Sequence, residues 1–148
     1  MRKSERMRPV LQIALHRERK AAMDLGAARN DLGIKVLRLE ELVTYRTEYL
    51  QKFSQDGRNV MSADRMQGFR VFLDNLAKAI TEQKQIIFSS EQLVAQKFTN
   101  WQGMRTKLKM LDSVTARFRE TEGQLDEKIA QKEIDELGLG LHRATRNK

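Results

Sequence analysis

Cysteine is absent from this sequence, proline occurs once in 148 residues, and aromatic residues make up 6%. The lack of cysteine excludes a disulfide framework and a thiolate metal site, and it suits a reducing cytoplasm. No apolar run approaches the roughly 18 residues of a membrane span, and the basic start MRKSERMRPV is not followed by the apolar core of a signal peptide. Charged residues make up 32% of the chain, and such a composition with few helix breakers is typical of long helices or coiled coils. We therefore expect a soluble, cytoplasmic, all-α protein with no direct membrane insertion.

The net charge of +8 is concentrated at the two ends. Residues 1–20 carry seven Lys and Arg against two acidic residues, and the last six residues add three more basic groups. Residues 21–138 are balanced. Two basic ends around a neutral middle differ from a uniformly basic nucleic-acid binder, so no nucleic-acid partner is expected.

Apolar residues recur at alternating spacings of four and three on both sides of one turn-like segment, residues 54–59 (SQDGRN). Sustained spacing near 3.5 residues indicates a coiled-coil seam. The predicted seam of the first helix is Leu11, Leu15, Glu18, Ala22, Leu25, Arg29, Leu32, Val36, Leu39, Val43, Arg46, Leu50 and Phe53. Pro9 suits a first helical turn, and Gly138 and Gly140 suit a helix end. We predict a single domain (residues 1–148) with a helix at about 9–54, a turn at about 55–61, a helix at about 62–137 and flexible basic ends.

The two predicted helices match each other as an antiparallel hairpin. One register places Leu50 opposite Phe69, Leu39 opposite Ile80, and Leu25 opposite Val94, with its midpoint between Asn59 and Val60. A slip of one heptad would also align the seams, but the position of the turn selects this register. The predicted fold is thus a long two-helix antiparallel coiled-coil hairpin.

This register leaves part of the second helix without a partner. Pro9 would lie opposite Met110, so residues from 111 to about 137 would extend past the first helix by roughly 40 Å. Phe118, Leu125 and Ile129 would then present apolar side chains at an open end. Fraying of the last turns, dimerisation there, and a dedicated partner all remain open.

Two tyrosines, Tyr45 and Tyr49, lie off the main seam, on a flank that the hairpin brings beside Phe72. Contiguous exposed apolar surface marks a contact site, and tyrosine suits such sites because its hydroxyl stays solvated. The alternative is that these residues only thicken the seam. The predicted strip consists of Leu42, Tyr45, Tyr49, Phe72 and Ala79, with Leu76 and Gln83 at its edge.

The run Leu42-x-x-Tyr45-x-x-x-Tyr49, the glycine-containing turn, and Phe72-x-x-x-Leu76-x-x-Ala79-Ile80-x-x-Gln83 resemble the FliJ family. Trp101 and the basic stretch Arg105, Lys107 and Lys109 are also similar to that family. The specific part of the resemblance covers about residues 42–109.

The resemblance implies a soluble coiled-coil component of the bacterial flagellar export apparatus, similar to the central stalk of rotary ATPases. Its end with the chain termini would insert into the ring of the export ATPase FliI and promote hexamerisation. Its flank would contact the cytoplasmic domain of the export gate FlhA, and it would bind and recycle export chaperones at the inner membrane periphery. The implied gate-binding residues are Leu42, Tyr45, Tyr49, Phe72, Leu76, Ala79 and Gln83; those facing the ATPase ring are Leu11, Leu15, Phe118, Leu125 and Ile129.

Nothing in the sequence indicates catalysis. The phosphate-binding pattern GxxxxGK[ST] is absent, and His16 and His142 have no paired ligand pattern. We therefore expect no catalytic, cofactor-binding or metal-binding residue. The alternatives are the equivalent stalk protein of another type III secretion system, a structural coiled-coil dimer, and a basic helical protein that binds nucleic acid.

Overall fold

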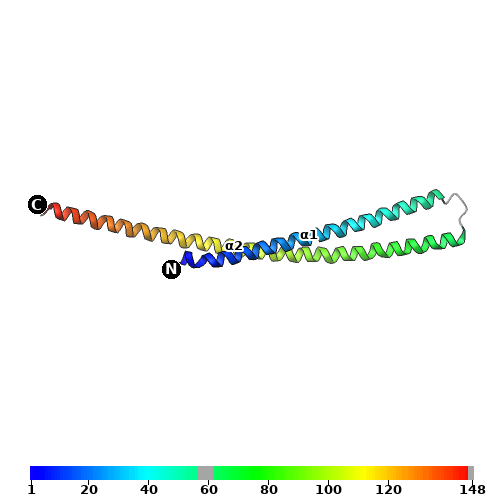
Figure 1. Cartoon of the computed structure of the whole chain (residues 1–148), viewed down its shortest axis with the longest axis horizontal. Coiled ribbons are helices and arrows are strands. Elements are labelled where there is room, and N and C mark those ends of the chain that lie inside the picture. The colour runs from blue at the N-terminus through cyan, green and yellow to red at the C-terminus, as the bar shows by residue number, and fades with distance from the viewer. Residues whose placement is uncertain (57–61, 147–148) are drawn as a thin grey trace. The chain divides into compact units, whose positions relative to one another are not determined.

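The computed structural model describes residues 1–56 and 62–146, and these fold into two helices, α1 (Lys3–Asp56) and α2 (Ala63–Arg146) (Figure 1). The helices pack against each other in opposite directions, which confirms the predicted all-α two-helix hairpin. The predicted turn centre between Asn59 and Val60 lies outside the described residues. The chain divides into two compact units, residues 20–102 and residues 1–19 with 103–148, and each is described by itself.

In the unit of residues 20–102, the core lies along the seam between the two helices. Leu25, Leu76, Ile80 and Ile87 are buried there, as the apolar spacing predicts. Polar bonds also cross the seam: the Gln83 side-chain amide donates to the Lys35 carbonyl oxygen at 2.9 Å, and the Ser90 hydroxyl lies 3.5 Å from an Asp31 carboxylate oxygen. Residues far apart in the sequence thereby define an antiparallel pairing.

Three predicted seam positions of α1 in this unit are exposed, namely Ala22, Arg29 and Leu50. Next to the first two, the buried residues are Ala21 and Ala28. The Arg29 guanidinium instead lies 5.9 Å from the centre of the Phe98 ring, at the side of the seam. Because alanines occupy several neighbouring positions here, spacing alone did not identify which of them face α2.

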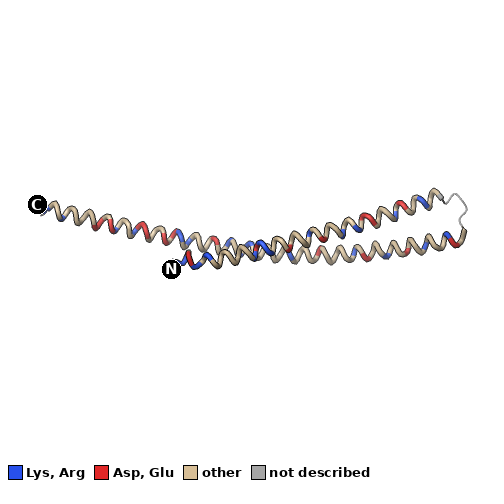
Figure 2. The backbone as a smooth tube through the Cα atoms, in the orientation of Figure 1, with Lys and Arg blue, Asp and Glu red and all other residues tan. Residues whose placement is uncertain are grey.

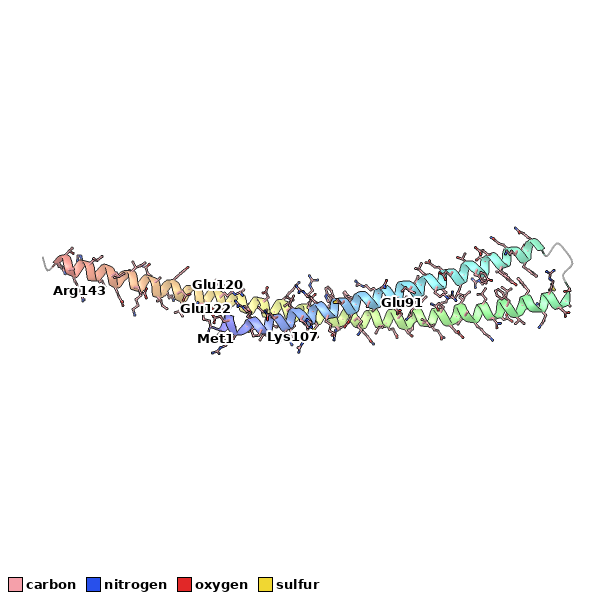
Figure 3. All side chains as sticks on the ribbon, viewed as in Figure 1. Met1, Glu91, Lys107, Glu120, Glu122 and Arg143 are labelled. Carbon is pink, nitrogen blue, oxygen red and sulfur yellow. The ribbon has the colours of Figure 1, made fainter. Side chains whose placement is uncertain are left out.

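The second unit pairs the start of α1 with residues 103–126 of α2. Ala14 and Thr115 are buried between the helices, Thr115 with only 1% of its surface exposed. Ser4 donates hydrogen bonds to the Glu122 carboxylate from its backbone amide, at 3.1 Å, and from its hydroxyl. Glu122 therefore accepts from one of the amides at the helix start that have no partner within α1; Figure 3 shows Glu122 near this end of α1, beside Met1.

Both helices are longer than predicted. α1 begins six residues before the expected start, so that Pro9 lies inside the helix, and α2 runs through Gly138 and Gly140 to Arg146. The residues before Pro9 are held by bonds to α2, which no local sequence signal could indicate. Glycine disfavours a helix by only about 1 kcal/mol, and within the described part of the chain no residue has a positive φ that would end one.

The extent of the unpaired end was also predicted wrongly. α1 contacts α2 as far as Asp126, since Arg2 binds that residue through two hydrogen bonds of 2.9 and 2.6 Å. Phe118 is therefore half-buried, with the Lys3 ammonium 5.5 Å from its ring centre, and does not lie in an open overhang. Every described residue from 123 to 146 is exposed, so burial against α1 ends at Glu122, and the segment without a contact to α1 begins after Asp126.

Most of the net positive charge of the chain lies where the start of α1 pairs with α2. Residues 1–19 and 103–122 contain eleven Lys and Arg against five Asp and Glu, a net charge of +6. Figure 2 shows Lys and Arg on both helices of this unit. In the described ranges, neither helix contains a stretch that is long and apolar enough to cross a membrane.

Candidate functional site

An aromatic cluster joins the two helices at the end of the unit of residues 20–102 that lies nearest the connection between them. Tyr49 lies between two rings of α2, with ring centres 5.0 Å from Phe69 and 4.3 Å from Phe72. Phe53 stacks on Phe69 at 3.9 Å, and Tyr45 meets Phe72 edge-on at 5.8 Å. Such pairs contribute about 0.5–1.5 kcal/mol each beyond burial, so the cluster holds this part of the hairpin together.

A groove of about 500 Å³ lies along one flank of this cluster. Its apolar surface comes from five residues of the strip predicted from the sequence, namely Leu42, Tyr45, Phe72, Leu76 and Ala79. Leu76 is buried at the base, whereas half of the Tyr45 surface is exposed. The two helices thus expose together an apolar surface that neither would form alone.

The other two residues of the predicted strip lie beside the groove and do not line it. Tyr49 is half-buried among the aromatic rings. Gln83 is half-buried too, and its amide is used in the hydrogen bond to the Lys35 carbonyl oxygen. Five of the seven predicted residues therefore share one surface, and two support the pairing of the helices that forms it.

Sequence reasoning missed the polar lining of the groove. Arg38, Glu41 and Asn75 line it with the apolar residues, and an Arg38 nitrogen lies 3.4 Å from a Glu41 carboxylate oxygen. Both charged side chains are well exposed, so this pair contributes little to stability. Arg38 lies four residues before Leu42 and Asn75 three residues after Phe72, a helical spacing that could have identified both as neighbours of the strip.

The residues predicted to face an ATPase ring do not form one surface. Leu11 and Leu15 line a second groove of about 420 Å³ together with Leu108. The charged residues at its border are Arg8, Lys109, Arg119 and the acidic Asp112. Phe118 is half-buried under Lys3, whereas Leu125 and Ile129 are exposed. Of the predicted residues, only Leu11 and Leu15 line a groove, and this groove lies in the basic part of the unit.

Electrostatic contacts hold the N-terminal end of α1 to α2. The hydrogen bonds from Arg2 lower the pKa of the Asp126 carboxyl, and those from Ser4 lower the pKa of Glu122. The pKa of Arg2 is raised for the same reason, since Asp126 stabilises its charged form. These pKa shifts belong to a structural contact, because each is caused mainly by a hydrogen bond between the two helices.

The chemistry of the described side chains is that of docking surfaces. Among the residues that the structure describes, no three His, Asp or Glu side chains gather as they would around a metal ion. Both grooves are lined by aliphatic or aromatic side chains with charged groups at their edges. Such surfaces fit apolar side chains of another protein.

Comparison with known proteins provides the family. The chain matches the family model described as "Flagellar FliJ protein" over residues 3–147, which is nearly its whole length. A search of curated proteins and a search of solved structures each found no match. The family is a non-catalytic component of flagellar protein export. The match across nearly all of α1 and α2 shows that this chain belongs to the flagellar FliJ protein family.

Proposed function

We propose that this component of flagellar protein export docks on the cytoplasmic domain of the export gate FlhA through the groove of the hairpin. The observation that supports the proposal is the groove of about 500 Å³ between α1 and α2. Its apolar lining combines Leu42 and Tyr45 from one helix with Phe72 and Ala79 from the other. Tyr49 and Gln83 complete the proposed gate-binding set by fixing the helices, and Leu76 forms its base.

The groove presents a tyrosine next to a phenylalanine in a concave surface. Half of Tyr45 is exposed although it contacts Phe72 edge-on. Removal of a partly exposed aromatic group from water favours binding by roughly 25 cal/mol per Å² of apolar area. Tyrosine is frequent among the residues that dominate protein interfaces. A gate segment with an apolar side chain would gain that energy without a rearrangement of the hairpin.

The test compares two double variants that each remove one apolar side chain from each helix. Tyr45→Ala with Phe72→Ala alters the groove. Leu37→Ala with Phe88→Ala is the matched control, because these residues are 59% and 60% exposed and do not line the groove. Calorimetric titration with the FlhA cytoplasmic domain should show at least a tenfold weaker affinity for the groove variant, about 1.4 kcal/mol or more.

The control variant should bind the gate domain like the parent protein, and both variants should keep their far-UV helical signal. Motility should fall with the groove variant alone. Unchanged affinity of a folded groove variant would reject the proposed gate site, and equal weakening by both variants would reject its specificity.

We further propose that the basic unit, residues 1–19 with 103–148, faces the FliI ATPase ring and promotes its hexamerisation. The net charge of +6 and the apolar groove lined by Leu11 and Leu15 support this assignment, with Phe118, Leu125 and Ile129 as further candidates. In this proposal the hairpin is a cytoplasmic, non-enzymatic, stalk-like protein at the periphery of the inner membrane. It also returns export chaperones for reuse.

The proposed contact with the ATPase is tested separately from the proposed contact with the gate. Leu11→Ala with Leu15→Ala should reduce the stimulation of FliI hexamerisation, measured by light scattering, and should leave gate binding unchanged. Full stimulation by that variant would remove the two leucines from the ATPase site. If DNA displaced FliI at physiological salt, nucleic acid would be the better partner for the basic unit.

A further inference from the structure

Another groove lies between α1 and α2 in the unit of residues 1–19 with 103–148. Its volume is about 240 Å³, and it shares no lining residue with the second groove, that of Leu11 and Leu15. Its walls are apolar side chains of both helices, and its charged lining residues are the two cations Arg17 and Lys107 (Figure 3 labels Lys107). We call this the basic groove, and it is lined by Val10, Ile13, Ala14, Arg17, Met104, Lys107 and Leu111.

Exposed apolar side chains lie beside the cations on both helices. Four residues of α1 recur at spacings of four, three and four and so share one face, namely Arg6, Val10, Ile13 and Arg17. Met110 lies three residues after Lys107, on the same face of α2. Val10, Ile13 and Met110 are 41%, 54% and 64% exposed in that order. This flank of the unit therefore has apolar residues between cations.

The three cations of this flank have no acidic neighbour on their own helix. On a helix, charges three or four positions apart are neighbours. Those positions hold no Asp or Glu around Arg6, Arg17 or Lys107. Within residues 1–56 and 62–146, none of the three forms an ion pair. Their positive charge is therefore available to a partner.

The cations of the second groove provide a contrast. Arg8 follows Glu5 by three residues, and Lys109 precedes Asp112 by three. Each of these cations thus has a carboxylate at a neighbouring helical position, and Asp112 itself lines the second groove. Uncompensated positive charge is therefore a property of the basic groove and not of every surface of the unit.

We infer that the basic groove binds an acidic amphipathic helix of another protein. Apolar side chains of that helix fill the groove beside Val10 and Ile13, and its carboxylates pair with the cations at the two ends. Arg6 and Arg17 are eleven residues apart, which is about 16 Å along a helix. The bound helix therefore carries acidic residues about three turns apart, with apolar residues between them. This inference rests neither on the proposed gate contact nor on the proposed ATPase contact.

The combination of charge and apolar surface selects this partner among other anions. Nucleic-acid phosphates would pair with the cations but would leave the exposed side chains of Ile13 and Met110 in water. An anionic membrane surface needs apolar side chains that project into it, whereas Val10 and Ile13 line a concave surface. An acidic helix covers both kinds of group at once. Because its ion pairs are exposed to solvent, each contributes at most about 1 kcal/mol, and the affinity falls as salt rises.

A synthetic peptide of about 20 residues, long enough to form a helix, tests the basic groove. It carries two Glu residues eleven positions apart, with Leu at the fourth and seventh positions after the first Glu, in an alanine-rich sequence. Fluorescence anisotropy of the labelled peptide, titrated with the full chain at physiological salt, should show saturable binding. Replacement of both Glu by Lys in the peptide should abolish it. A parent chain that does not bind the acidic peptide, or binds both peptides equally, would overturn the inference.

Two charge-reversal variants locate the binding site. Arg17→Glu with Lys107→Glu should weaken peptide binding by about tenfold or more, because two attractive contacts become repulsive. Arg8→Glu with Lys109→Glu is the matched control, since it makes the same change of charge at exposed positions of the second groove. The control should bind the peptide within about threefold of the parent affinity, and both variants should keep their far-UV helical signal. Equal weakening by both variants, or none by the first, would contradict the assignment.

Competition separates this partner from other anions and from the ATPase. Phosphatidylglycerol vesicles and duplex DNA should leave the peptide bound to the parent chain at physiological salt, and its release by either would assign the basic groove to that anion instead. Leu11→Ala with Leu15→Ala, which tests the ATPase contact, should bind the peptide like the parent chain. Loss of the peptide from that variant would place it in the second groove, so the two proposals can fail separately.

Discussion

The contact between Ser4 and Glu122 holds the first turn of α1 against α2. Glu122 belongs to α2, yet it accepts hydrogen bonds from the backbone and the hydroxyl of Ser4. Arg2 reinforces this contact through its paired bonds to Asp126. These side chains hold residues before Pro9 in a helix although proline cannot donate a backbone hydrogen bond there.

Acid should release the N-terminal end of α1. Because the pKa values of Glu122 and Asp126 are lowered in the folded chain, their stabilising effect is present above the ordinary carboxyl pKa, about 4. It is lost as the pH falls further through the lowered pKa values. In NMR spectra recorded during acid titration, the Ser4 amide resonance should then shift toward its position in the unfolded chain. The amide resonances of residues 20–50 should stay unchanged.

The variant Glu122→Gln should produce part of that shift at neutral pH, because the neutral amide accepts weaker hydrogen bonds. Glu120→Gln is the control, since Glu120 lies two residues away and outside the contact. An unmoved Ser4 resonance in Glu122→Gln would show that the carboxylate does not hold the helix start.

Gln83 provides a second test on the scale of one residue. Its amide donates to the Lys35 carbonyl oxygen across the seam. Gln83→Ala should therefore lower the free energy of unfolding by about 1 kcal/mol, and its effect on gate binding should be smaller than that of Tyr45→Ala. Urea denaturation and titration with the gate domain measure the two effects. A stable variant that loses gate binding would mean that Gln83 contacts the gate directly.

For the two helices, the features that depend on the spacing of apolar residues could be predicted from the sequence. The features that depend on contacts between distant residues could not. Spacing predicted two antiparallel helices and the burial of Leu25, Leu76, Ile80 and Ile87. The choice between Ala21 and Ala22 was missed, because alanine carries little hydrophobic signal.

Two further errors, at the start of α1 and in the unpaired end of α2, share a cause. Pro9 and Phe118 were misplaced because the contacts of Arg2 and Ser4 with α2 join residues more than 100 positions apart. The strip was predictable because residues of one flank follow helical spacing on each helix. The edge residues Arg38 and Asn75 follow the same spacing but are polar, so a search for apolar residues at helical spacing does not find them.

The glycines inside the helices give a prediction at this scale. A Cβ atom added at Gly33 or Gly103 would meet no other heavy atom within 4 Å. Gly33→Ala and Gly103→Ala should each stabilise the fold by about 1 kcal/mol, because glycine loses more backbone entropy in a helix. Thermal and urea unfolding measure the gain.

The reverse substitution Ala27→Gly is the matched control for these glycines. Ala27 is an exposed position of α1, and glycine there should cost about the same amount. Destabilisation by Gly33→Ala would mean that this position needs its open space.

In the molecule as a whole, both helices contribute side chains to each of the surfaces described above. The groove takes apolar residues from α1 and α2, and the basic unit takes Lys and Arg from both ends of the sequence. The family assignment and the groove together lead to the proposal that the hairpin contacts the export gate.

The most direct measurement of that proposal is site-specific cross-linking to the FlhA cytoplasmic domain. Ala79 lines the groove, whereas Ala77, two residues away, lies exposed outside its lining. Because the chain has no natural cysteine, Ala79→Cys and Ala77→Cys each carry one reactive position for a short cross-linker. If the groove contacts the gate, the gate domain is captured from position 79 with little or no capture from position 77. Equal capture from both positions, or capture from position 77 alone, would contradict the proposed contact.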